Sequence, residues 1–173
     1  MASQFDTMAA KADILALLRV PQDLTLRFFA VFSRFEYALK RAGYVDKSVA
    51  SRVTADWESF ARDVVSTLEP SRVSRLLASC GYLQSHPPKK QVWKNDRLQW
   101  VGRGLNAGSA LGEALRSVRT VRNNVFHGGK FPEGPIEEPL RDEQLVRDCL
   151  VVLEGLLALP LPRDVSKYFE PEE

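Results

Sequence analysis

The sequence predicts an all-α protein that folds as an antiparallel bundle of about five to six helices. Two observations favour this fold class. Apolar residues recur at steps of three and four along the long segments of the chain, which is the spacing of one face of an α-helix. Most connections between these segments are short, as is typical of helices that run antiparallel.

The length of the chain indicates one domain. Its 173 residues are enough to bury a full core, so we expect a single domain over residues 1–173. We expect the helical core over about residues 22–159. Pro160 and Pro162 end the last helix, so a flexible C-terminal tail is predicted over about residues 160–173.

The first half of the chain carries two long apolar series. One runs from Leu24 to Leu39, with Gly43 as the stop signal of a long core helix. The second predicts a helix that ends before Pro70, after which Ser71 can cap a shorter helix through Cys80 and Gly81. The apolar residues of this second series are Val49, Val53, Trp57, Phe60, Val64 and Leu68.

The second half predicts two more helices. One runs from about Gly108 to His127, and the last from about Asp142 to Leu159. The loop between them, Gly128 to Pro139, is rich in Gly and Pro and carries several glutamates. This loop either gates the residues that precede it or is a plain surface linker.

Composition excludes several classes of protein. The chain has 24 Lys and Arg against 22 Asp and Glu, so any basic surface must be local. Cys80 and Cys149 form no Cys-x-x-Cys pair, which favours a reduced cytosolic chain without a structural metal or other cofactor. The chain has no basic leader and no apolar run of about 18 residues. We therefore expect a soluble cytoplasmic protein with no membrane contact.

A basic segment with two tryptophans lies between Tyr82 and Asn106. Interleaved cationic and aromatic side chains suit phosphate contact and base stacking, so Lys89, Lys90, Trp93 and Lys94 are candidate RNA-binding residues. The alternative is a short irregular or hairpin segment whose tryptophans cover the bundle.

The end of the Gly108–His127 helix carries the most informative residues. Arg122 interrupts an apolar stripe formed by Leu111, Leu115, Val118, Val121 and Val125. An adjacent face carries Arg116, Arg119, Asn123 and His127, with Asn123 one turn before His127. Arg116, Arg119 and the following Lys130 are further candidates for RNA binding.

These side chains suit phosphodiester cleavage. RNA can cleave itself when its 2′-hydroxyl attacks the adjacent phosphorus, a reaction that needs proton transfer and cationic stabilisation. His127 can move the proton, and Arg122 can clamp the phosphate. Asn123 can orient the His127 ring or contact the ribose.

The alternative interpretation is a well-capped helix end. Arg and His are common in the last turn of any helix, and Gly128-Gly129 is an ordinary stop. On this interpretation Arg122 needs a buried anion or an oligomer interface. Glu36 is the candidate partner, and Arg119 is a second supporting candidate.

The chain resembles the HEPN family of all-helical proteins, whose motif is an Arg, four to six residues and a His on a late helix. The match is Arg122-Asn123-Asn124-Val125-Phe126-His127, and Phe32–Leu39 resembles the early long helix of the family. The resemblance implies a metal-independent endoribonuclease with Arg122 and His127 catalytic and Asn123 supporting. It also implies 2′,3′-cyclic phosphate products, a homodimer with one composite cleft, and a toxin or antiviral role with a possible cognate antitoxin or inhibitor protein.

Two alternatives of other classes stay open. One is a catalytically silent HEPN-type module that binds nucleotides or proteins. The other is a structural helical bundle in which Arg122 pairs with Glu36 internally.

Overall fold

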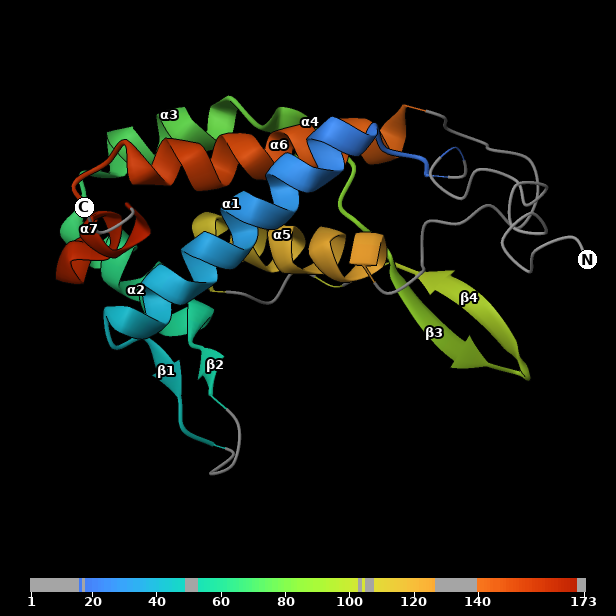
Figure 1. Cartoon of the computed structure of the whole chain (residues 1–173), viewed down its shortest axis with the longest axis horizontal. Helices are drawn as coiled ribbons and strands as arrows, with labels where there is room; N and C mark the ends of the chain where they lie inside the picture. Colours follow the sequence, from blue (N-terminus) through green and yellow to red (C-terminus); the bar gives the residue numbers. More distant parts are fainter. Residues whose placement is uncertain are drawn as a thin grey trace, which may run out of the picture.

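The computed structural model describes residues 16, 18–48, 53–102, 104, 108–126 and 140–170. This part of the chain is mostly helical, with two small antiparallel sheets (Figure 1). The prediction of a helical protein is confirmed at this level. The seven α-helices of the described part are α1 (Gln22–Arg41), α2 (Trp57–Thr67), α3 (Pro70–Ala78), α4 (Gly81–Ser85), α5 (Ala110–Phe126), α6 (Arg141–Leu157) and α7 (Val165–Phe169).

Helices α1, α5 and α6 pack around the centre of the core. Helices α5 and α6 run in opposite directions, and α1 crosses both of them (Figure 1). The predicted stripe of α1 is buried, from Leu24 through Phe28, Phe32 and Phe35 to Leu39. Gly43 follows with a φ of +82°, a conformation that favours glycine and turns the chain out of the helix.

The second predicted helix begins later than its apolar series indicates. The chain at Thr54–Ala55 (β2) is extended and pairs with Val45–Asp46 (β1). Helix α2 starts at Trp57 because Asp56 caps it, with its carboxylate accepting a hydrogen bond from the Ser59 backbone at 2.9 Å. The expectation that Val53 belongs to this helix is wrong.

The predicted short helix after Pro70 is divided into two. Helix α3 takes Pro70 rather than a residue after Ser71 as its first position. It ends at Ala78, and α4 follows after a turn. The Leu83 backbone of α4 donates to the buried Asp148 carboxylate of α6 at 2.8 Å. This bond holds the short helix against α6.

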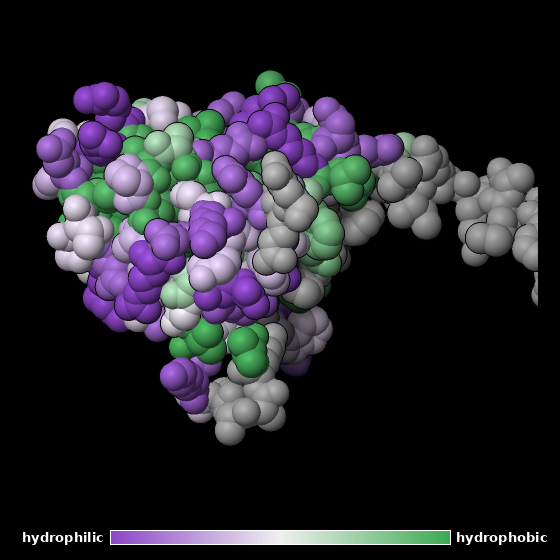
Figure 2. Space-filling model, turned by 60° about the vertical axis from the view of Figure 1, so that its left-hand side comes forward, coloured by the Kyte–Doolittle hydropathy of each residue, from purple (hydrophilic) through white to green (hydrophobic). Residues whose placement is uncertain are grey.

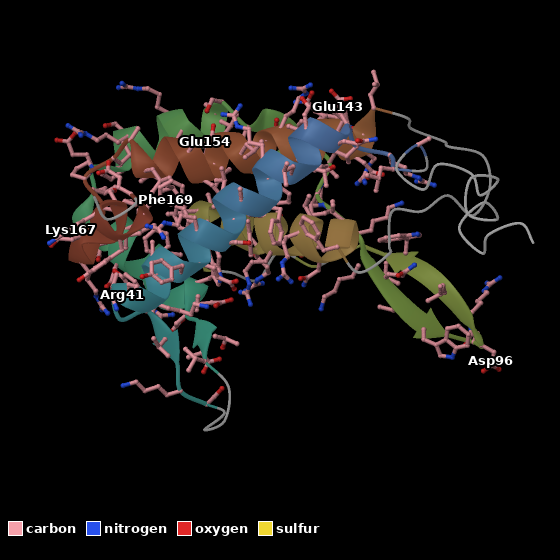
Figure 3. All side chains as sticks on the ribbon, in the orientation of Figure 1. Arg41, Asp96, Glu143, Glu154, Lys167 and Phe169 are labelled. Atoms are coloured by element: carbon pink, nitrogen blue, oxygen red, sulfur yellow. The ribbon has the colours of Figure 1, made fainter. Side chains whose placement is uncertain are left out.

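Strands β3 (Lys90–Lys94) and β4 (Arg97–Val101) form a hairpin that projects away from the helices (Figure 1). Asn95 and Asp96 join the strands with positive φ values of 53° and 54°. Positive φ at both loop positions is the geometry of a type I′ turn, which Asn and Asp tolerate well. Asp96 marks the tip of the hairpin in Figure 3.

The C-terminal segment packs onto α1, so the expectation of a flexible tail is wrong for its helical part. Residues Pro162–Asp164 form a 3-10 helix (η3), and α7 follows. Val165 is fully buried, and the Phe169 ring lies 6.5 Å from that of Phe35. The Arg34 side chain donates to the Phe169 carbonyl at 2.6 Å. Figure 2 shows a face of the molecule on which hydrophilic and hydrophobic residues lie next to one another in small areas.

Candidate functional site

Arg122 lies one turn before the end of α5 at Phe126, half-buried at the edge of the buried stripe. Its guanidinium carbon lies 5.4 Å from the centre of the Phe32 ring on α1. Its Nη1 donates to the Asn123 side-chain oxygen at 3.1 Å. The aromatic contact explains how a cation is accommodated where the pattern favours an apolar residue.

Glu36 does not take the role of ion-pair partner. It is half-buried on α1, and the described part of the chain contains no ion pair between Glu36 and Arg122. The structural alternative based on this pair therefore has no support from the observed contacts.

The polar face of α5 carries Arg116, Arg119 and the exposed Asn123. Arg119 forms an ion pair with Glu58 of α2 at 2.9 Å, and Arg116 lies 3.7 Å from Glu113. The structure thus places the predicted cations on one helix face that leads to Asn123. His127 follows Phe126 directly in the sequence and lies, with Lys130, outside the described residues.

Asn124 is a residue of the motif to which the sequence analysis assigns no role. Its side chain is buried, and its amide nitrogen donates to the Lys89 carbonyl at 2.9 Å. This bond joins the end of α5 to the base of the hairpin. The spacing of polar residues could have indicated that Asn124 is buried. Ser117, Thr120 and Asn124 recur at helical spacing, and they lie on one buried face of α5.

The two faces of the hairpin differ in chemistry. Because side chains alternate along a strand, Trp93 shares a face with Leu98 and Trp100, whereas Lys90 shares the other with Lys94 and Arg97. Trp93 is 69% exposed and Trp100 is 42% exposed. The interpretation that these tryptophans cover the bundle is therefore wrong.

The candidate RNA-binding residues of the hairpin do not all lie beside the motif. Lys89 is tied to Asn124 through its carbonyl, and Lys90 begins β3 next to it. Trp93 and Lys94 lie at the far end of the same strand, about 10–13 Å further along at 3.3 Å per residue. Trp93 and Lys94 are therefore far from the bond that joins the hairpin to Asn124.

An apolar surface lies beside Arg122. The Phe126 ring of α5 and the Phe29 ring of α1 lie 5.2 Å apart, and both side chains are partly exposed. Leu26 is 69% exposed on the same helix. Leu18, Gln22 and Thr25 complete the walls of a shallow hollow of about 320 Å³ at this position. We call Leu26, Phe29 and Phe126 the apolar patch.

Other reactive groups of the described chain lie away from the motif. Burial raises the pKa of both cysteine thiols, and the Asp148 charge raises it further. These thiols therefore stay protonated, which makes them poor nucleophiles. His86 is exposed at the end of α4, and its ring stacks on Tyr82 at 4.3 Å.

Two further findings bear on the class of protein. No helix in the described ranges is long and apolar enough to cross a membrane. Comparison with models of known families, with curated proteins and with solved structures found no match. The residues and their geometry therefore carry the argument for function.

Proposed function

We propose that the protein is a metal-independent endoribonuclease of HEPN type, with Arg122, Asn123 and His127 in the cleft. The observation that supports this most directly is the arrangement of α5. Its polar face leads from Arg116 and Arg119 to Asn123, and Arg122 lies beside this face, one turn before the end of the helix at Phe126. A row of cations that ends at a titratable group suits a phosphodiester strand.

The proposed reaction uses the RNA's own 2′-oxygen. That oxygen forms a bond to phosphorus while the bond from phosphorus to the 5′-oxygen breaks. The proton of the 2′-hydroxyl is removed and the 5′-oxygen gains one, with His127 taking part in this transfer. Arg122 stabilises the charge on the phosphoryl oxygens. The products end in a 2′,3′-cyclic phosphate and a 5′-hydroxyl.

We propose a homodimer in which two motif helices share one cleft. The apolar patch supports this, because exposed apolar residues that cluster on a surface are typical of interaction sites. A two-fold axis would place the patch of one protomer against that of its partner. Phe126 and Arg122 are one turn apart, so such contact brings both motifs to the interface.

Mixing two inactive variants tests the shared cleft. Chains with His127→Ala and chains with Arg122→Ala are combined so that heterodimers form. If one cleft takes His127 from one protomer and Arg122 from the other, these heterodimers regain one intact pair and part of the activity. A monomeric wild type with full activity would contradict the shared cleft.

Labelled total RNA tests the enzymatic activity itself. The expected result is cleavage by the wild type and a loss of about 10²–10⁴-fold in rate for His127→Ala or Arg122→Ala. Arg122→Lys keeps the charge but loses the bidentate geometry, so its activity also falls. The matched control is Arg147→Ala, which removes an exposed arginine of α6 that pairs with Glu143. Equal background cleavage by all these proteins would exclude the activity.

A second candidate is a HEPN-type binding module without catalysis. The exposed aromatic face of the hairpin, which carries Trp93, Leu98 and Trp100, favours it, because such a face suits base stacking or a protein partner. This candidate predicts RNA binding without cleavage, and binding that does not depend on His127.

A further inference from the structure

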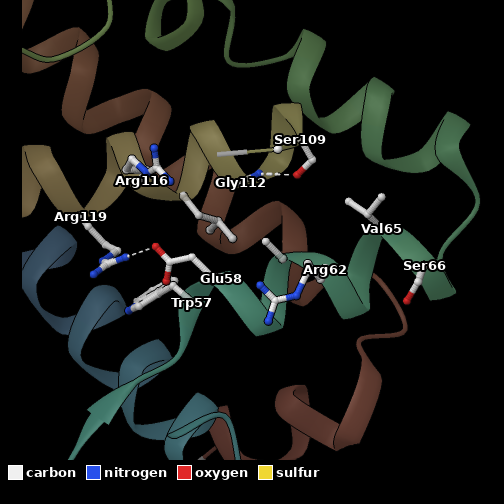
Figure 4. Close-up of a pocket in the computed structure, with 12 residues that line it drawn as sticks. Trp57, Glu58, Arg62, Val65, Ser66, Ser109, Gly112, Arg116 and Arg119 are labelled. Carbon is white, nitrogen blue, oxygen red and sulfur yellow. Dashed lines mark hydrogen bonds and ion pairs between the residues drawn. The ribbon is translucent and has the colours of Figure 1, made fainter. Parts of the chain in front are cut away.

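A second hollow lies on the molecule between α2 and the N-terminal half of α5 (Figure 4). It has a volume of about 560 Å³, which falls within the range of small-molecule sites. Trp57, Ala61 and Leu115 are buried residues of its floor. We call this hollow the α2–α5 groove.

Three arginines border the groove. Arg62 belongs to α2, whereas Arg116 and Arg119 belong to α5 (Figure 4). Among the described residues of the lining, Glu58 is the one acidic residue. The sequence does not reveal this cluster, because Arg62 lies more than 50 positions before the other two.

The arginines are held in place by neighbouring side chains. Arg119 donates to Glu58 at 2.9 Å, and Arg62 donates to the Ser59 hydroxyl at 2.6 Å. Arg116 lies 3.7 Å from Glu113. A guanidinium has five N–H donors, so the single bond from Arg119 to Glu58 leaves it able to donate to a ligand as well.

An apolar floor with an arginine border matches the chemistry of a nucleotide. A planar base can lie against apolar side chains, and arginine is the side chain best suited to a phosphate. Gly112, Arg116, Arg119 and Asn123 follow one another at steps of four, three and four on one face of α5. Arg116 and Arg122 are therefore only about 9 Å apart along the helix axis.

We propose that the α2–α5 groove is a nucleotide subsite. Its arginines bind the phosphate and its floor takes the base. The nucleotide is either free or part of an RNA strand whose next residues reach Arg122. Binding of an RNA strand in the groove rests on the proposed function, whereas binding of a free nucleotide does not.

Binding of adenosine 5′-monophosphate, measured by titration calorimetry, tests the subsite. We expect adenosine 5′-monophosphate to bind more tightly than adenosine, which lacks the phosphate, and more tightly than inorganic phosphate, which lacks the base. Arg116→Gln and Arg62→Gln should each weaken binding about tenfold. Arg147→Gln on α6 is the matched control and should bind as the wild type does. Glu58→Gln removes a negative charge from the lining and should strengthen binding.

A 2′-O-methyl oligoadenylate, which cannot be cleaved through its 2′-oxygen, separates the two sources of nucleotide. If it binds more tightly than the mononucleotide and with the same dependence on Arg116, the groove holds part of a strand. If only the mononucleotide binds with a dependence on Arg116, the subsite serves a free nucleotide. If neither binds, or if both arginine variants bind as the wild type does, the proposal is overturned. The affinity for the mononucleotide is measured without any cleavage, so a lack of RNA cleavage would not affect that result.

Discussion

Two groups of aromatic residues in the described part of the chain differ in exposure. Around the C-terminal end of α1, Phe35, Trp57 and Phe60 are buried, with the Phe35 ring 5.6 Å from that of Trp57. Around the end of α5 and on the hairpin, Phe29 is 48% exposed and Trp93 is 69% exposed. Phe29 and Phe35 are six residues apart on the same helix, yet they belong to different groups.

The difference separates what stabilises the fold from what contacts a partner. Burying a Phe side chain contributes about 1.5–3 kcal/mol of stability. The exposed aromatic residues contribute less to stability and instead present apolar surface to solvent, which is typical of an interaction site. Substitutions in the buried group should therefore change stability, and substitutions in the exposed group should change association or RNA binding.

The largest expected effect is on the buried group. Phe35→Ala leaves a cavity among Trp57, Phe60 and Phe169, so it should lower the free energy of unfolding by about 3–5 kcal/mol. Phe29→Ala on the same helix should lower it by about 1 kcal/mol or less and weaken dimerisation. Chemical denaturation and analytical ultracentrifugation measure the two quantities. Similar losses of stability in both variants would remove the distinction between the groups.

The next effect concerns RNA binding by the hairpin. Stacking of one base on an aromatic ring contributes about 1–3 kcal/mol, so Trp93→Ala should weaken RNA binding by about 5-fold to 150-fold. The melting temperature of the Trp93→Ala protein should stay near that of the wild type, because the Trp93 ring is largely exposed. Filter binding with 2′-O-methyl RNA measures the affinity, and Val53→Ala supplies an exposed apolar control. Unchanged affinity in Trp93→Ala would assign the aromatic face to a partner other than RNA.

A smaller effect should come from the link between the two surfaces. Asn124→Ala leaves the Lys89 carbonyl without its bond from α5, at a cost of about 1–3 kcal/mol in stability. It should also loosen the hairpin, which hydrogen exchange at β3 can detect. Asn123→Ala is the matched control, since Asn123 is exposed and should affect cleavage rather than exchange. Equal exchange rates in both variants would contradict the role given to Asn124.

The smallest effect lies at the start of α2. Burial raises the pKa of Asp56, but hydrogen bonds from Ser59 and the charge of Arg62 lower it by more, so its pKa lies below the usual range. The ionised cap is therefore the stabilising form, and its contribution is lost as pH falls. Asp56→Ala should cost about 1 kcal/mol at pH 7, and the difference should shrink below about pH 4. A constant difference between pH 7 and pH 3 would contradict the stabilising role of the ionised Asp56 cap.

Much of the fold could be predicted from periodicity, because α1, α5 and α6 bury long stripes at helical spacing. The start of α2 could not be predicted in this way. Its apolar series continues before Trp57, but the cap at Asp56 and the pairing of two short strands, β1 and β2, make the helix begin at Trp57. The packing of α7 could not be predicted either. It involves contacts between residues far apart in the sequence, such as the hydrogen bond from Arg34 to the Phe169 carbonyl.

The candidate site was predictable only in its local part. Arg122 and Asn123 follow from the pattern of one helix, and the structure places them at its end. The roles of Asn124 and Arg62 depend on the hairpin and on α2, and spacing within one segment does not report contacts between segments. Exposure of Trp93 is a tertiary property of the same kind.

We propose that Arg122 and His127 cleave RNA through its own 2′-oxygen. Mass spectrometry of the RNA ends formed by the purified wild type in the presence of EDTA tests it most directly. We expect 2′,3′-cyclic phosphate ends with the wild type and none above background with His127→Ala, and no cut where the 2′-hydroxyl is replaced by methoxy. Ends that carry a 3′-hydroxyl, or cleavage that stops on chelation, would contradict it.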